Sequence, residues 1–212
     1  MKKDEQKRSF DLCDCDDICV IPACRPHDDC KVGPTGATGA TGITGPTGPT
    51  GECSCNCVSN GELVTNGGME DIQDDKPTNW IFENEDGISS NDAQGRVHSG
   101  NYSVNIEDSS SISQRISISG GCYYRLSFFA RGEGSSVGLD ASIIFETASG
   151  EIDGGNLSIR QQDITNSNRD FAFYQLISDK APLNTTAIVI KFLVNSSGGQ
   201  SLDLDDVSLS LI

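Results

Sequence analysis

The chain has 212 residues, enough for one ordinary domain plus extensions, and its formal net charge is −16. So acidic a chain lacks the basic surface that nucleic acids and anionic membranes require, and we expect neither as a partner. No segment approaches the run of about 20 apolar residues that spans a bilayer. The N-terminal MKKDEQKRSFDLCDCDD has no apolar core typical of a signal peptide, so we expect synthesis in a cytosol.

Residues 1–32 form a charged, cysteine-rich region that we expect to be irregular. The chain has nine cysteines, and five of them lie here: Cys13, Cys15, Cys19, Cys24 and Cys30. Persistent disulfides are rare in reducing cytosol, so these thiols need an explanation. One alternative is a zinc site that uses His27, although the spacing matches no standard zinc motif. The favoured interpretation is an anchoring region that is cross-linked after assembly in an oxidising place.

Residues 33–51 carry glycine at every third position, from Gly33 to Gly51. This period is the signature of the collagen triple helix, because only glycine fits at the axis of three wound chains. The segment therefore predicts a homotrimeric stalk of roughly 60 Å at about 3 Å per residue. A flexible Gly/Thr spacer remains the alternative, since the run is short. Each complete triplet ends in threonine, at Thr35, Thr38, Thr41, Thr44, Thr47 and Thr50.

Residues 52–60 form a short junction with three more cysteines, Cys53, Cys55 and Cys57. Cysteines on both flanks of the triplets favour the trimer, because cross-links hold three chains in register and lower the entropy of the separated state. We therefore expect all eight of these flanking cysteines to take part in cross-linking. The ninth, Cys122, is either a buried small hydrophobe or an exposed cross-linking thiol.

Residues 61–212 are the only segment able to bury a core, and their pattern predicts an all-β jelly-roll sandwich. Short apolar stretches rich in β-branched and aromatic residues alternate with Gly, Ser, Asn and Asp clusters, and no long stretch has helical period. The expected strands are 102–106, 111–118, 123–130, 141–146, 171–177, 187–194 and 202–211. We expect turns at 119–121, 132–136, 149–155 and 195–200.

Five motifs in this segment resemble carbohydrate-binding modules of the family 4/9/22 type and related heads of spore-surface proteins. They are LVTNGGMED (63–71), KPTNW (76–80), HSGNYSVNI (98–106), SQRISISGGCYYRLSFFARG (113–132) and LDLDDVSLSL (202–211). The resemblance covers residues 63–211 and implies a jelly-roll fold with Trp80 in the core. Met69 stands where the family has an aromatic residue, a change that a core tolerates.

The resemblance also implies a structural calcium site. The family's ligands correspond to Glu70 and Asp205, with loop carbonyls near Gly67 and Gly68. Calcium takes six to eight hard oxygen ligands, which fits this set. The alternative is that both carboxylates are only solvated or hydrogen-bonded.

Glycan binding is a further implication of the resemblance, since such modules stack aromatic rings on sugars. The candidate residues are Phe82, Tyr102, Tyr123, Tyr124, Phe145, Phe173 and Tyr174. Several of them alternate along strands, where a core position is the default expectation.

Catalysis has little support. The two histidines, His27 and His98, lie in no recognisable nucleophile–base arrangement, and no G-x-S-x-G, H-E-x-x-H or P-loop pattern occurs. We therefore expect that this protein is not an enzyme.

The leaderless start, the G-x-T triplets, the cysteine-rich flanks and the compact β head together resemble collagen-like glycoproteins of Bacillus and Clostridium spore surfaces. This resemblance implies an exosporium or spore-appendage location, other spore-coat proteins as cysteine-linked partners, and O-glycosylation of the triplet threonines. The leading hypothesis is a structural trimer that displays three heads. The alternatives are a lectin-like adhesion module and a zinc-dependent assembly scaffold.

Overall fold

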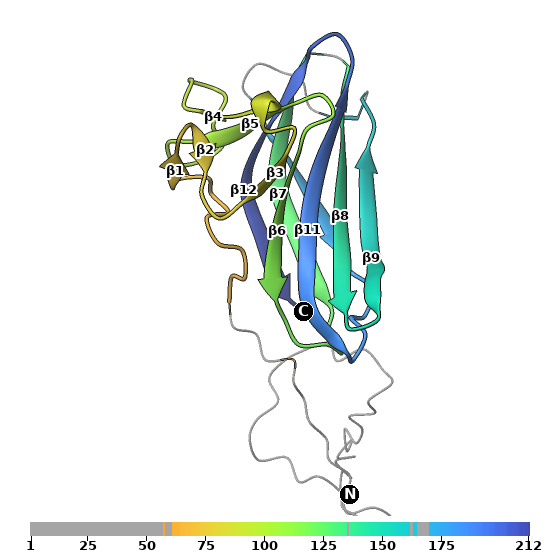
Figure 1. The fold of residues 1–212 in the computed structure, drawn as a ribbon. Coiled ribbons are helices and arrows are strands. Elements are labelled where there is room, and N and C mark those ends of the chain that lie inside the picture. Colours follow the sequence, from red (N-terminus) through yellow and green to blue (C-terminus); the bar gives the residue numbers. More distant parts are fainter. Residues whose placement is uncertain (1–56, 58–60, 135, 162, 165–169) are drawn as a thin grey trace, which may run out of the picture. The chain divides into compact units, whose positions relative to one another are not determined.

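The computed structural model describes residues 57, 61–134, 136–161, 163–164 and 170–212. These residues form an all-β sandwich of two five-stranded antiparallel sheets, which confirms the predicted fold class (Figure 1). The predictions for the N-terminal region, the triplet stalk and most of the junction lie outside the described residues. Within those residues, no helix is long and apolar enough to cross a membrane.

One sheet has the strand order β10-β7-β12-β5-β4, the other has the order β3-β6-β11-β8-β9, and β1 and β2 form a small separate hairpin. The element bounds are β1 Ile72–Gln73, β2 Lys76–Pro77, β3 Ile81–Glu83, the 3-10 turn η1 Glu85–Gly87, β4 Ile88–Asn91, β5 Ser103–Glu107, β6 Ser111–Ser117, β7 Tyr124–Glu133, β8 Val137–Thr147, β9 Gly150–Ile159, β10 Ala172–Ile177, β11 Thr185–Ser196 and β12 Ser201–Leu211.

The core lies between the two sheets and follows from period-two alternation. Along β7, Tyr124, Leu126, Phe128 and Ala130 are buried while the residues between them face outward, because successive side chains of a strand point to opposite faces. Trp80 is 6% exposed, so the prediction that it belongs to the core is confirmed.

The N-G-G-M-E segment is a turn held together by Asn66. Its side-chain amide donates to the backbone carbonyls of Asp71 and Thr78, at 2.9 and 3.0 Å, and the backbone carbonyl of Asn66 accepts from the indole N–H of Trp80. Glycine is required next in the chain, because a Cβ on Gly67 would lie 2.0 Å from the carbonyl oxygen of Val207 on β12. The motif therefore docks the start of the head onto its last strand.

The sequence did not predict β1, β2, β3, β4 or β9, and β9 is the longest of these five strands. Residues 149–155 read as a turn, yet β9 runs from Gly150 to Ile159 and pairs with β8. Its glycines have a packing reason: a Cβ on Gly154 would lie 2.6 Å from the ring of Phe145, next to an irregularity in the β8–β9 register. Ile152 is the single β-branched residue among residues 149–155, so the local pattern does not mark a strand and only the pairing with β8 reveals it.

Cys57 forms a disulfide with Cys122 of the same chain, with a Cα–Cα distance of 5.6 Å. The expectation that Cys57 cross-links different chains is therefore wrong for this structure. Cys122 is buried, as one of the two alternatives held, but as half of a disulfide rather than as a free thiol. The sequence offered no sign of this pair, because the two residues are 65 positions apart.

Candidate functional site

A polar pocket opens at one end of the β3-β6-β11-β8-β9 sheet. Its volume is about 310 Å³. It is formed where the first residues of β8, the last of β9 and the last of β11 come together. The lining residues are Gly138, Asp140, Ser158, Ile159, Arg160, Gln161 and Asn195.

The pairing register brings the polar side chains of this pocket together. Asp140 lies opposite Ser158, and Gly138 lies opposite Asn195. The carboxylate of Asp140 accepts hydrogen bonds from the Ser158 hydroxyl and, at 2.6 Å, from the Asn195 amide. This network holds an acceptor and two donors at the pocket without burying any of them fully.

The rest of the pocket wall adds charge and apolar surface. Arg160 is exposed and pairs with Asp163 at 3.0 Å, and Ile159 is only 7% exposed. Gly138 leaves little room for a side chain, since a Cβ there would lie 3.0 Å from the backbone carbonyl oxygen of Ile159. Carboxylate, amide, hydroxyl and guanidinium groups are hydrogen-bonding partners that suit a ligand with many hydroxyls.

The same outer sheet face continues away from the pocket as a polar surface. Lys191 contacts Glu83 at 2.6 Å, and Arg115 contacts Glu146 at 2.7 Å. The hydrogen bond from Lys191 and the one from Ser111 lower the pKa of Glu83. This face has no aromatic side chain at its centre, so it suits hydrogen bonding better than ring stacking.

The predicted stacking residues do not form one platform. Tyr124 is 1% exposed, with its hydroxyl on the Ser119 carbonyl, and Phe145 is fully buried, so both predictions are wrong. Tyr174 is half-buried against Phe128 in the core. The remaining candidates are scattered: Phe82, Tyr102 and Tyr123 are half-buried, and Phe173 is 55% exposed.

Phe173 belongs to a small aromatic cluster on the outer face of the other sheet. It lies 5.3 Å from Phe129 between ring centroids, and His98 stacks on Phe129 at 3.6 Å. Phe171 meets the edge of His98. Because His98 already covers Phe129, Phe173 is the most exposed ring of this cluster.

Glu70 and Asp205 both bind the segment between residues 98 and 102. The Glu70 carboxylate is exposed and accepts from the backbone N–H groups of Asn101 and Tyr102, at 2.8 and 3.1 Å, and from the Asn101 amide. Burial alone raises the pKa of Glu70, but these hydrogen bonds lower it overall.

Asp205 is fully buried and accepts from the backbone N–H groups of His98 and Ser99. Burial raises the pKa of Asp205 to about 6, and the nearby Asp206 carboxylate adds to the increase. A cation would remove this repulsion.

The test for a calcium site gives a partial fit. A Cβ on Gly68 would lie 3.6 Å from the Oδ1 atom of Asp206 and 3.9 Å from the Cγ atom of Glu70, so one carboxylate oxygen lies at this turn, while the Glu70 carboxylate itself lies against Gly100 and Asn101. No group of three or more His, Cys, Asp or Glu side chains that could hold a metal occurs among the described residues. A calcium ion would therefore depend on loop carbonyls in addition to the carboxylates of Glu70 and Asp205.

A buried ion pair on β12 is structural. Asp203 is fully buried and accepts from Arg131 at 2.6 Å and from Arg96 at 2.9 Å. Burial would lower the pKa of Arg96, but the hydrogen bond and charge of Asp203 raise it overall. The pair joins β7 and β12 to the segment that precedes β5.

The remaining predicted site residues are not described by the structure. They are the cross-linking cysteines Cys13, Cys15, Cys19, Cys24, Cys30, Cys53 and Cys55, the zinc alternative with His27, and the triplet threonines.

Comparisons with solved structures support the sandwich. A family 61 carbohydrate-binding module in complex with β-1,4-galactotriose matches with a TM-score of 0.54 and 19% identity over 70% of this chain and 97% of that chain. A cyclase from Fischerella sp. TAU matches with a TM-score of 0.54 and 13% identity over 73% of this chain and 97% of that one. The enzymatically active domain of tailspike protein 4 from bacteriophage CBA120 matches with a TM-score of 0.52 and 20% identity, over 71% of this chain and 21% of that one.

No protein-family model matches the sequence, and no curated protein matches it. At these identities the solved structures establish the fold alone, and the fold occurs both in binding modules and in enzymes. None of the three is a collagen-like or spore-surface protein, so that resemblance stays a prediction.

Proposed function

We propose that the head is a non-catalytic carbohydrate-binding module and that the polar pocket around Asp140 is its glycan site. The observation that carries this proposal is the preorganised network in which Asp140 is held by Ser158 and Asn195 inside a hollow of about 310 Å³. Neighbouring sugar hydroxyls donate and accept together, and this set of side chains offers both roles.

The glycan class follows from the pocket and its surroundings. The pocket admits one terminal sugar unit, and the polar face beyond it offers hydrogen bonds to further units of a chain. Because no aromatic ring lines the pocket, we expect weak binding that depends on the positions of the sugar hydroxyl groups more than on stacking against the face of the sugar ring. Because one solved structure of similar fold holds β-1,4-galactotriose, β-linked galactose oligosaccharides are the first ligands to try.

The test is a glycan array probed with the full chain, followed by titration of the best ligand. Asp140→Asn keeps the side-chain shape but replaces one acceptor oxygen and removes the charge. We expect it to weaken binding about ten-fold or more, as hydrogen bonds to a charged group are worth roughly 1.5–3 kcal/mol. The matched control is Asp92→Asn, the same change at an exposed position between β4 and β5.

Two results would contradict the proposal. One is a glycan that binds the wild type and Asp140→Asn equally well, which would move the site elsewhere, for example to the ring of Phe173. The other is silence on the whole array, which would favour the structural display role expected from the triplet stalk and the cysteines.

We also propose that three heads are displayed on the triplet stalk at a spore surface, with cross-linked cysteines as the anchor. The support is the sequence pattern of residues 1–57 and not the sandwich. Sizing the intact protein with and without reductant tests the trimer, and a monomer in both conditions would contradict it.

Calcium is proposed as a structural ion held by Glu70, Asp205 and loop carbonyls near Gly67 and Gly68. Its support is the neighbouring carboxylates of Asp205 and Asp206 beside this turn and the raised pKa of the buried Asp205. Millimolar calcium should raise the melting temperature of the wild type but not that of Glu70→Gln. An equal rise in both proteins, or none in either, would contradict this site.

A further inference from the structure

The sequence contains two Asn–Gly steps, Asn60–Gly61 and Asn66–Gly67. This dipeptide is chemically labile in a flexible chain, because glycine has no side chain that would keep its backbone nitrogen away from the preceding side-chain amide. The second step lies at the centre of the turn that docks the start of the head onto β12. The pocket around Asp140 involves neither step.

The fold requires both members of the Asn66–Gly67 step. The backbone of Asn66 has a φ of 54°, in the left-handed region that asparagine enters more easily than most residues. Gly67 has no room for a side chain, since an added Cβ would lie 2.0 Å from the carbonyl oxygen of Val207. A turn of this shape therefore keeps a labile pair of residues.

The side chain of Asn66 is fixed by three hydrogen bonds. Its Oδ1 atom accepts from the N–H of Asp71 at 3.0 Å, and its Nδ2 atom donates to the backbone carbonyls of Asp71 and Thr78. The amide therefore cannot turn toward the nitrogen of Gly67 without breaking these bonds, and each of them would have to be replaced by water.

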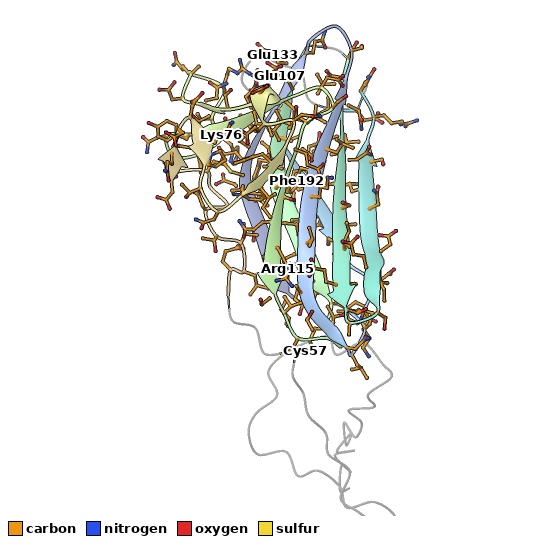
Figure 2. The ribbon with its side chains drawn as sticks, in the orientation of Figure 1. Cys57, Lys76, Glu107, Arg115, Glu133 and Phe192 are labelled. Atoms are coloured by element: carbon orange, nitrogen blue, oxygen red, sulfur yellow. A yellow bond between two sulfur atoms is a disulfide. The ribbon has the colours of Figure 1, made fainter. Side chains whose placement is uncertain are left out.

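The backbone of the step is held from both sides. The carbonyl of Asn66 accepts from the indole N–H of Trp80 at 3.1 Å, and the carbonyl of Gly67 accepts from the N–H of Val207 at 2.9 Å. The buried ring of Trp80 lies 6.3 Å from the ring of Phe192, in the middle part of the sandwich (Figure 2). A rotation that brings the nitrogen of Gly67 onto the amide carbon therefore requires the start of the head to leave the core.

We propose that Asn66 is a deamidation site that the folded head closes and that unfolding of the turn opens. In the open turn the backbone nitrogen of Gly67 attacks the Cγ atom of Asn66, and a C–N bond forms. The Cγ–Nδ2 bond breaks, and the amide nitrogen leaves as ammonia with the proton that Gly67 gave up. Water then opens the resulting succinimide ring at either carbonyl and yields aspartate or isoaspartate.

Neither product can rebuild the turn. The carboxylate of an aspartate only accepts hydrogen bonds, so one of its oxygens faces the carbonyls of Asp71 and Thr78, to which the amide donated. Isoaspartate also lengthens the backbone by one carbon just before Gly67, which has no space to move toward Val207. Deamidation thus marks a head that has unfolded and keeps it from returning to the native fold.

The test follows both steps by peptide mapping of the full chain, incubated at mildly alkaline pH with and without concentrated urea. Asn60–Gly61 is the control for the effect of urea on the reaction itself, since Gly61 is exposed and nothing lies within 4 Å of a Cβ added to it. In urea the two steps should react at similar rates. Without urea, deamidation of Asn66 should be at least about ten-fold slower than in urea, because only the open fraction of the turn reacts.

Two results would overturn the proposal. One is deamidation of Asn66 that is as fast in the native chain as in urea. The other is an Asn66 that stays intact in urea while Asn60 reacts.

The consequence for refolding is tested on the same molecules. After incubation the urea is diluted, the refolded chains are isolated by size-exclusion chromatography, and their peptides are mapped. The refolded chains should have an intact Asn66 and a deamidated position 60, and equal modification of both positions would refute the claim that deamidation of Asn66 prevents refolding.

A pair of variants tests the aspartate product directly. Asn66→Asp should lower the urea midpoint of the head, whereas the matched change Asn60→Asp should leave it at the wild-type value. An Asn66→Asp head that unfolds at the wild-type midpoint would contradict the proposal.

Discussion

Removal of the Cys57–Cys122 disulfide should destabilise the head through the unfolded state. The bond closes a loop with a sequence separation of 65 residues. The chain-entropy estimate for such a loop is about 4 kcal/mol at 25 °C. In Cys57→Ser the buried Cys122 remains as a small apolar thiol, so no cavity adds to this figure.

Trp80 makes the measurement specific to the head. It is the only tryptophan of the chain and is 6% exposed, so its fluorescence reports unfolding of the sandwich and not of the stalk. With a urea dependence of about 2 kcal/mol per M, a loss of about 4 kcal/mol lowers the urea midpoint by roughly 2 M. Reductant should lower the wild-type midpoint to that of Cys57→Ser and leave the variant unchanged.

The matched control is Cys53→Ser, the same substitution four residues earlier in the junction. It should leave the Trp80 midpoint where it is. The reasoning is refuted if Cys57→Ser unfolds at the wild-type midpoint, or if Cys53→Ser lowers it equally. In the first case the bond does not form, and in the second both cysteines act through chain association.

Three further changes test individual contacts. Burial raises the pKa of Asp205 from 3.8 to about 6, so the folded state holds this proton more tightly than the unfolded state does. As the pH rises from about 4 to about 6 in the presence of chelator, ionisation of Asp205 should lower the free energy of unfolding by about 3 kcal/mol. Asp205→Asn should lose this part of the pH dependence in urea titrations, and an unchanged pH profile would contradict the assignment. Arg131→Met leaves the buried Asp203 with fewer charge partners and should lower the free energy of unfolding by about 3 kcal/mol. If the Arg131–Asp203 ion pair is the cause, the same substitution should cost less in the Asp203→Asn background. Gly67→Ala places a Cβ against the carbonyl of Val207 and should cost about 2 kcal/mol in thermal or urea unfolding, whereas a neutral effect would mean that this turn is free to move.

The sequence predicted the strands that bury one face. All seven expected strands are present, because alternating β-branched and aromatic residues mark half-buried strands whatever their partners. The strands β1 to β4 were missed because they are only two to four residues long. The edge strand β9 was missed because its first residues are mostly glycines and acids, which turns also use. Its strand state comes from pairing with β8, which no local pattern encodes.

The same limit explains the misplaced aromatics. In YYRLSFFA, alternation says that neighbouring rings face opposite sides, but it does not say which side is the core. The structure buries Tyr124 and leaves Tyr123 half-exposed. Only the pairing of β7 with β10 and β12 decides this, and the choice removes Tyr124 from any ligand surface.

The pocket itself could not be predicted from local sequence. Asp140, Ser158 and Asn195 come from three strands, and each looks like an ordinary exposed polar residue in its own segment. Register alone unites them, because Asp140 lies opposite Ser158 and β11 brings Asn195 beside β8. The Cys57–Cys122 pair is a similar case, since one partner lies in the junction and the other beyond β6.

The disulfide and the pocket around Asp140 lie at opposite ends of the sandwich, so they should act independently. The strand β8 runs from Val137, near the pocket, to Thr147, which pairs with Thr185 close to the Cys122 loop. At about 3.3 Å per residue, roughly 30 Å lies between the two ends, well beyond the distance at which substitutions usually couple. The loss of urea midpoint caused by Cys57→Ser should therefore be the same in the wild type and in Asp140→Asn, and Cys57→Ser should leave glycan titration of the folded head unchanged. If the two substitutions are not additive, the disulfide and the pocket share a coupled region, and the assignment of separate roles to the two ends is wrong.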